Sequence, residues 1–452
     1  MGTKGVTQQN GSRDVKKYVI ASLFGSALEW YDFFLYATAA SLVLGRLFFP
    51  AGVDPLVGTM GAFAGFAVGF AARPLGGLIF GHIGDKVSRK TSLVLTLSIM
   101  GAATFLMGLL PTYGQVGIVA PILLILLRIV QGIAAGGEWG GGVLLISENS
   151  GAERRGLLSA FSQSGVSLGF VLSAGAFFLV QLLPEEQFLS WGWRIPFMLS
   201  LLIFVVGMYI RFRLPDNTDF KDSNEPKHSS VPVIEALKTH PKEILIGMGL
   251  RIAENGGSYL FLSFSIVYGV HVGVDQGILL IGCMLSMIMS FGTTLFFGHL
   301  SDKIGRRRVY TFGALMLIVL AFPFFTLIQS DSAPLILLAF FMANGLCHAA
   351  MIGAQPAFFH ELFSAKIRYS AMSIAHEVAA VVAGGLAPLI ATALLLKYDS
   401  SIPVSIYAII LACITLIALA FSRNLGQRRV QANGQGHEST PDKHFIVESE
   451  VK

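Results

Sequence analysis

Long apolar segments follow one another along almost the whole of this 452-residue chain. Most are at least about 20 residues long, which is the length that an α-helix needs to cross the hydrocarbon core of a bilayer. Apolar residues make up 54% of the sequence and charged residues only 13%, whereas a soluble globular domain carries about 25% charge. The natural solvent for this chain is therefore a lipid bilayer, in which backbone polar groups are paired within helices.

The segments predict an all-α integral membrane protein with twelve transmembrane helices. They lie at about 18–46, 57–82, 91–110, 117–147, 156–183, 194–213, 243–271, 276–299, 309–328, 333–361, 370–396 and 403–422. One long polar connection follows the sixth segment and divides the chain into two six-helix bundles. We expect an N-terminal tail at 1–17, the first bundle at 18–213, a linker at 214–242, the second bundle at 243–422 and a C-terminal tail at 423–452.

The basic residues predict the orientation of these helices. With both termini in the cytoplasm, 26 of the 32 Lys and Arg residues fall in the tails, linker and cytoplasmic loops. Only Arg46, Arg194 and Lys397 fall in loops on the external side of the membrane, and the remaining three lie within the spans. Cytoplasmic loops are enriched in Lys and Arg, so this asymmetry supports a multi-pass protein of a bacterial inner (plasma) membrane. It also accounts for the net charge of +5 without a nucleic-acid partner. We expect a monomer in the lipid bilayer.

A polar, basic decapeptide occurs once in each half of the chain. Residues 81–90 read GHIGDKVSRK and residues 298–307 read GHLSDKIGRR. Each lies between the second and third apolar segments of its half. The two halves therefore resemble parallel structural repeats related about an axis along the membrane normal.

The decapeptides carry groups that suit a cytoplasmic gate. Glycines let helices approach closely, and the aspartates can accept hydrogen bonds from a helix N-terminus and pair with arginine. The alternative is a short basic loop without a further role, but repetition in equivalent places favours the gate. The candidate gate residues are Gly81, Asp85, Arg89, Gly298, Asp302 and Arg306.

These paired motifs resemble the loop signature of the major facilitator superfamily. The stretches EWYDF at 29–33, ARPLGG at 72–77, GGEWGG at 136–141, WGWRIPF at 191–197 and RYS at 368–370 further resemble the metabolite:proton symporter family within it. The stretch PVIEALKTHP at 232–241 is most similar to shikimate-type permeases. The resemblance implies a proton-driven carrier of small organic acids. Two departures are Ser88, where glycine is usual, and His376-Glu377, where relatives commonly show Tyr-Gln.

Acidic and basic residues inside the first and fourth segments are candidates for proton coupling. Glu29 and Asp32 are three residues apart and share a helix face. In a low dielectric it is costly for both carboxylates to be ionised, so one is suited to carry a proton. Arg128 lies in an R-x-x-Q-G pattern that resembles the superfamily's proton-coupling motif in span four. We expect Asp32 to be the main proton site with Arg128 as its counter-charge; the alternative is a static buried ion pair.

Several polar residues within the segments are candidates for substrate binding. Arg73 is suited to bind a substrate carboxylate through two hydrogen bonds, or to pair with Glu29 or Asp32. Arg251, Glu254, Asn255 and Tyr259 share a helix face, although Arg251 and Glu254 are also spaced for a structural ion pair. The full candidate set is Arg73, Arg128, Arg251, Asn255, Tyr259, Tyr36, Gln163, Trp139 and His376. His348 is more typical of a hydrogen-bonded core histidine, and Glu138 and Glu377 have no assigned role.

The sequence contains no P-loop, no catalytic triad pattern and no zinc-ligand spacing, so we expect no cofactor, no metal and no enzyme activity. The favoured function is a proton-coupled symporter that imports an organic acid, either a shikimate-like hydroxy acid or another mono-, di- or tricarboxylate. One alternative is proton-coupled uptake of a zwitterionic osmolyte such as betaine or proline. A membrane enzyme or sensor is a further alternative from another class.

Overall fold

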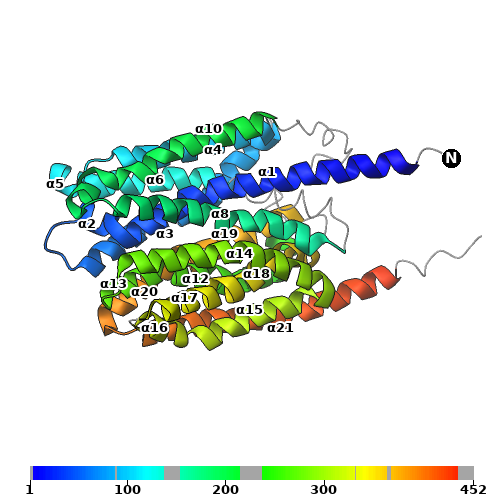
Figure 1. The fold of residues 1–452 in the computed structure, drawn as a ribbon. Helices are drawn as coiled ribbons and strands as arrows, with labels where there is room; N and C mark the ends of the chain where they lie inside the picture. The colour runs from blue at the N-terminus through cyan, green and yellow to red at the C-terminus, as the bar shows by residue number, and fades with distance from the viewer. Residues whose placement is uncertain are drawn as a thin grey trace, which may run out of the picture.

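The computed structural model describes residues 4–86, 89–136, 153–213, 237–330, 332–363 and 368–435. Figure 1 shows two layers of roughly parallel helices, the first half of the chain above the second. Both the start of α1 and the end of α21 lie at the same end of the molecule, which we call the termini end. The all-α fold with two six-helix bundles is confirmed, and the described helices line up as six rods in each half.

The first bundle is built from α1 to α10. Its helices are α1 (Lys4–Ala39) with the π-helix η1 (Ala40–Leu44) and α2 (Gly45–Leu47), then α3 (Pro55–Lys86), α4 (Arg89–Leu109), α5 (Tyr113–Val116), α6 (Val119–Ala135), α8 (Arg155–Gln181), and α9 (Glu185–Gln187) with η2 (Phe188–Gly192) and α10 (Arg194–Arg213). Helix α1 begins at Lys4, within the sequence expected to form the N-terminal tail.

The second bundle is built from α12 to α21. Its helices are α12 (Pro241–Tyr259) with η4 (Leu260–Phe264) and α13 (Ser265–His271), α14 (Gln276–Ile304), α15 (Arg306–Leu320) with α16 (Pro323–Ile328), α17 (Ala333–Phe340) with η5 (Phe341–His348) and α18 (Ala349–Leu362), α19 (Arg368–Ala379) with η6 (Ala380–Gly385) and α20 (Leu386–Tyr398), and α21 (Ile402–Gln435). Residues 214–236 of the expected linker and 436–452 of the expected tail lie outside the described residues.

Length and hydropathy alone identify fewer membrane spans than the twelve rods. Among the described residues, six helices are long and apolar enough, or seven if α9–η2 and α10, which meet at 45°, form one bent span. Two apolar stretches, Val94–Leu109 and Val119–Ala135, are shorter than a full span, and other rods are interrupted or carry acidic and basic residues. Helix α1 contains Glu29 and Asp32, and α12 contains Arg251 and Glu254; all four are buried. Their charges face the protein interior and not lipid.

Glycines bring the backbones of α3 and α6 into contact. A Cβ atom at Gly132 would lie 2.0 Å from the carbonyl oxygen of Gly69, and one at Gly76 would lie 1.8 Å from that of Ile133. Small residues permit this approach in membrane helices, where close packing replaces the hydrophobic effect as the attraction between helices. The contact fixes the two helices that carry Arg73 and Arg128 side by side.

We predict that Gly132→Ala lowers the Tm of the detergent-solubilised protein. The added methyl group forces α3 and α6 apart, at the cost of about 1–3 kcal/mol that is typical of overpacking. The matched control is Gly292→Ala in α14, where a Cβ atom meets nothing within 4 Å. Thermal unfolding of both variants measures the effect, and equal Tm values would contradict the close contact.

Candidate functional site

A narrow cavity lies between the two bundles, with room for water-sized spheres over only about 20 Å³. The first bundle contributes aromatic side chains from α1 and an amide from α8, whereas the second contributes most of the charged and polar groups from α12 and η5. Its principal lining residues are Trp30, Phe34, Gln163, Arg251, Glu254, Asn255, Tyr259 and His348. This space holds about one water molecule, so the two bundles must move apart to admit a larger ligand. Its position between two bundles is where transporters with internal repeats bind substrate.

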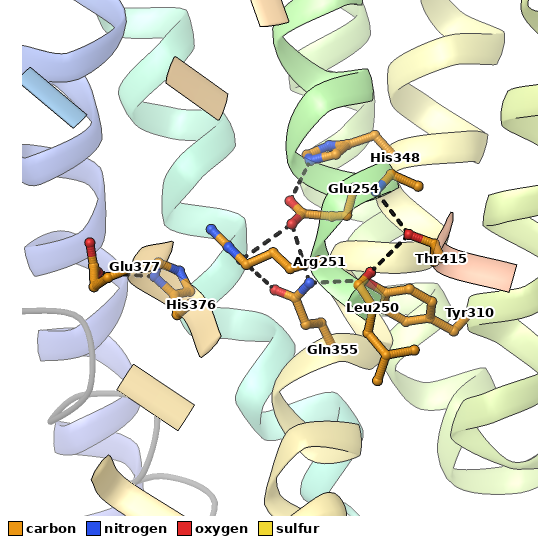
Figure 2. A network of polar contacts seen from close by, with 10 residues as sticks. Leu250, Arg251, Glu254, Tyr310, His348, Gln355, His376, Glu377 and Thr415 are labelled. Carbon is orange, nitrogen blue, oxygen red and sulfur yellow. Dashed lines mark hydrogen bonds and ion pairs between the residues drawn. The ribbon is translucent and has the colours of Figure 1, made fainter. Parts of the chain in front are cut away.

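A hydrogen-bonded network holds the charged wall of this cavity (Figure 2). The Arg251 Nη1 atom donates to Gln355 Oε1 at 2.7 Å and lies 3.2 Å from Glu254 Oε2. Gln355 Nε2 donates to Glu254 Oε2 at 3.2 Å and to the Tyr310 hydroxyl at 2.9 Å. The other Glu254 oxygen lies 3.2 Å from His348 Nε2. Both oxygens of Glu254 are thus engaged by groups of its own bundle.

Arg73 joins the two bundles through a buried ion pair. Its Nε atom donates to Glu377 Oε2 at 2.7 Å and its Nη2 atom donates to Glu377 Oε1 at 3.1 Å. Glu29 of its own bundle is a weaker partner, with Nη2 and Oε1 separated by 3.6 Å. The sequence predicted pairing of Arg73 with Glu29 as one alternative, but it did not predict Glu377 as the main partner. His376 Nδ1 lies 3.1 Å from Glu377 Oε1, so these neighbours contact each other.

Arg128 and Asp32 are connected indirectly. The Arg128 guanidinium lies 4.1 Å from the ring centroid of Tyr36, and its Nη1 atom donates to Gln131. Gln131 Nε2 donates to the Thr104 hydroxyl at 2.7 Å, and that hydroxyl donates its own hydrogen to the Met100 carbonyl at 2.9 Å. The Asp32 carboxylate lies within electrostatic range of both Thr104 and Arg128. In the part of the chain that the structure describes, no ion pair links Asp32 directly to Arg128. The expected counter-charge therefore acts on Asp32 through space and not through a direct ion pair.

Tyr259 links the cavity to the arginines of the first bundle. Its ring packs against Phe66 and Phe70, with centroid distances of 5.2 and 5.7 Å. Its hydroxyl lies within electrostatic range of Arg73, Arg128 and Arg251. Among the described residues this buried hydroxyl has no hydrogen-bond partner. Positive charge from three arginines thus acts on this hydroxyl, which favours an anion beside it.

The second decapeptide contacts the first bundle at the termini end. The Asp302 carboxylate accepts hydrogen bonds from the backbone N–H groups of Gly156 and Leu157, at 2.8 and 3.0 Å. It also pairs with Arg306 at 3.1 Å, and Arg306 in turn pairs with Glu361 at 2.8 Å. Both glycines permit close packing here, because a Cβ atom at Gly156 would lie 2.5 Å from the Gly298 carbonyl oxygen, and one at Gly298 would lie 2.9 Å from that of Gly156. These contacts join α14 to the N-terminus of α8.

The remaining candidates divide by position. Gln163, Arg251, Asn255 and Tyr259 line the cavity as expected. The side chains of Tyr36, Arg73, Arg128 and His376 are buried outside its lining, and the Tyr36 hydroxyl donates to the Ala62 carbonyl at 3.0 Å. Glu138, Trp139 and the side chains of Gly81, Asp85 and Arg89 lie outside the described residues. Sequence reasoning missed Trp30, Glu377 and Gln355, of which only Glu377 carried a signal, as a charge within a span.

Comparisons with known proteins agree with this arrangement. The family model described as Major Facilitator Superfamily matches residues 22–327 and 283–447. A shikimate transporter of Escherichia coli (strain K12) is 40% identical over 84% of this chain and 88% of its own length. A proline/betaine transporter of Salmonella typhimurium is 35% identical over 89% and 82%. A structure of the proton:xylose symporter XylE bound to a bromodeoxyglucose matches with a TM-score of 0.69 at 17% identity, over 92% of this chain and 96% of that one.

We predict that Arg73→Ala lowers the Tm strongly, because it leaves Glu29 and Glu377 buried without their shared cation. Breaking a buried pair costs about 3–5 kcal/mol. Arg46→Ala is the matched control, because Arg46 pairs with Glu185 at 3.0 Å but both side chains are more than half exposed. Such surface pairs contribute less than about 1 kcal/mol. An equal fall in Tm for the two variants, or a larger fall for Arg46→Ala, would contradict the role of Arg73.

Proposed function

The chain belongs to the Major Facilitator Superfamily and is a membrane transporter, not an enzyme, and we propose that it imports a small organic acid together with a proton. One observation carries this proposal. Asp32 is a buried carboxylate that has no ion-pair partner among the described residues, and it lies within electrostatic range of Arg128, beside a cavity between two bundles. The proposed substrate is a shikimate-like hydroxy acid or another carboxylate.

The count of buried charges supports a bound proton. In the described part of the chain the buried Asp, Glu, Lys and Arg residues are three arginines and four acids, namely Arg73, Arg128, Arg251, Glu29, Asp32, Glu254 and Glu377. If all were ionised, this group would carry one net negative charge. Uncompensated charge is costly at the bilayer centre, so a proton on one acid makes the group neutral.

Asp32 is the acid best placed to carry that proton. Glu29 and Glu377 lie beside Arg73, and Glu254 lies beside Arg251. Asp32 has no such ion pair among the described residues, and its Oδ1 atom has no hydrogen-bond partner. When Asp32 is protonated, Arg128 loses its compensating charge. The arginine then favours an incoming anion, which links the proton to the substrate.

Contacts at both ends of the bundles support alternating access. The Asp302 contacts close the termini end. Near the opposite end, the Ser41 hydroxyl donates to the Ser263 carbonyl at 3.0 Å across the bundles. The cavity thus lies between two inter-bundle contacts, which must separate in turn for substrate to enter and leave. The shared position of the termini supports placing both in the cytoplasm of a bacterial inner membrane, with the monomer as the working unit (Figure 1).

Uptake of a zwitterionic osmolyte is the second candidate. It is favoured by the proline/betaine relative and by the aromatic residues Trp30, Phe34 and Tyr259 in the cavity, since aromatic rings attract quaternary ammonium groups. Uptake of labelled shikimate and labelled betaine into proteoliposomes distinguishes the two. The organic-acid proposal predicts shikimate uptake that rises when the outside is acidified and stops with a protonophore. Uptake of betaine without uptake of shikimate would contradict the organic-acid proposal and support the osmolyte proposal.

We predict that Asp32→Asn abolishes proton-driven accumulation of the acid but preserves exchange of external for internal substrate. An amide cannot bind and release the transported proton, yet the bundles can still move with substrate bound. The matched control is Asp54→Asn, at an exposed position where the side chain caps α3 through the Leu56 N–H. Accumulation in proteoliposomes with an imposed pH gradient measures the difference. Normal accumulation by the Asp32 variant would remove this residue from the proton pathway.

A further inference from the structure

We propose that His348 accepts a hydrogen bond from a hydroxyl group of the substrate, and so selects cyclic carboxylates that carry a hydroxyl over those that do not. This inference rests on the proposed function and specifies the chemistry of the same cavity. His348 lies at the end of η5 and lines the cavity, and only 3% of its surface is exposed.

The contact with Glu254 determines which His348 nitrogen carries the hydrogen. Nε2 lies 3.2 Å from a carboxylate oxygen of Glu254, and an ionised carboxylate can only accept a hydrogen bond. The Nε2 atom must therefore carry the hydrogen. Nδ1 of a neutral imidazole is then an acceptor.

Within the part of the chain that the structure describes, the Nδ1 acceptor has no hydrogen-bond partner. A buried polar atom without a partner is costly, so the cavity is complete only when a ligand supplies an O–H or N–H group. A carboxylate or an ether oxygen cannot meet this need, whereas a hydroxyl group can.

Three other buried groups in the cavity offer hydrogens. In the described structure the Trp30 indole Nε1, the Asn255 amide Nδ2 and the Tyr259 hydroxyl also have no hydrogen-bond partners. The indole and the amide nitrogen can only donate. A ligand that suits this cavity therefore presents several acceptor oxygens and at least one hydroxyl hydrogen. A hydroxylated carboxylate satisfies both requirements.

The apolar walls favour a ring as the carrier of these groups. Trp30, Phe34 and Tyr259 present aromatic surface to the same cavity, beside Val166 and Ile352. A cyclic carbon skeleton buries its faces against such side chains while its substituents reach the polar atoms. A quaternary ammonium group would find no free carboxylate oxygen on Glu254, because both oxygens already contact His348, Gln355 and Arg251.

The test compares two acids that differ in their hydroxyl groups. Shikimate and 1-cyclohexene-1-carboxylate share a ring and a carboxylate, but only shikimate carries hydroxyls. We expect the wild-type protein to bind shikimate more tightly. In His348→Phe we expect the affinity for shikimate to fall by about 10-fold to 100-fold, as for loss of a buried hydrogen bond, while binding of the hydroxyl-free acid changes much less. Competition against labelled shikimate in proteoliposomes, or calorimetry in detergent, measures both.

Two controls separate this inference from a general loss of structure. His348→Gln keeps a side-chain donor toward Glu254 and an acceptor oxygen, so we expect it to recover most of the preference for shikimate. Retained binding of 1-cyclohexene-1-carboxylate by His348→Phe shows that this variant is folded. An unchanged preference in His348→Phe, or an equal loss for both acids, would overturn the role of His348. If the wild-type protein bound neither acid but bound betaine, the proposed function itself would fail.

Discussion

The burial of ionised groups within a bilayer is the constraint from which the rest of this structure follows. A charged side chain at the centre of a membrane helix costs about 2.5–3.5 kcal/mol on insertion scales, yet seven Asp, Glu and Arg residues are buried in the described helices. They are tolerated because they face one another in the protein interior, within each bundle and, for Arg73 and Glu377, across the two bundles. The apolar side chains are left to meet lipid, which explains the many exposed leucine, isoleucine and valine residues on the outer surface.

The buried charges form two kinds of contact with different consequences for movement. Arg251, Glu254, Gln355 and His348 all belong to the second bundle, so their network can move as a unit (Figure 2). The ion pair of Arg73 with Glu377 instead crosses between bundles. Any motion that separates α3 from α19 must break it. Each member then has a second partner in its own bundle, because Arg73 lies near Glu29 and Glu377 lies near His376.

Much of the fold and part of the site could be predicted from the sequence. Apolar segments and the polar linker between them are local features of the sequence, so the helices and the two halves could be predicted without a structure. The cavity positions of Arg251, Asn255 and Tyr259 followed from their shared helix face. The partner of Arg73 could not be found in this way, because Glu377 is separated from it by 304 residues and by the bundle interface. Gln355 and Trp30 likewise acquire their roles only when helices from different parts of the chain pack together.

The central claim is that substrate binding and protonation of the Asp32 site are thermodynamically linked. Isothermal titration calorimetry with an accepted acid, in buffers of different ionisation enthalpy between pH 6 and 9, tests it most directly, because the dependence of the heat on the buffer counts the protons exchanged on binding. The account predicts net proton uptake by the wild-type protein toward alkaline pH, where the empty site has lost its proton. Binding without proton exchange at every pH would contradict it.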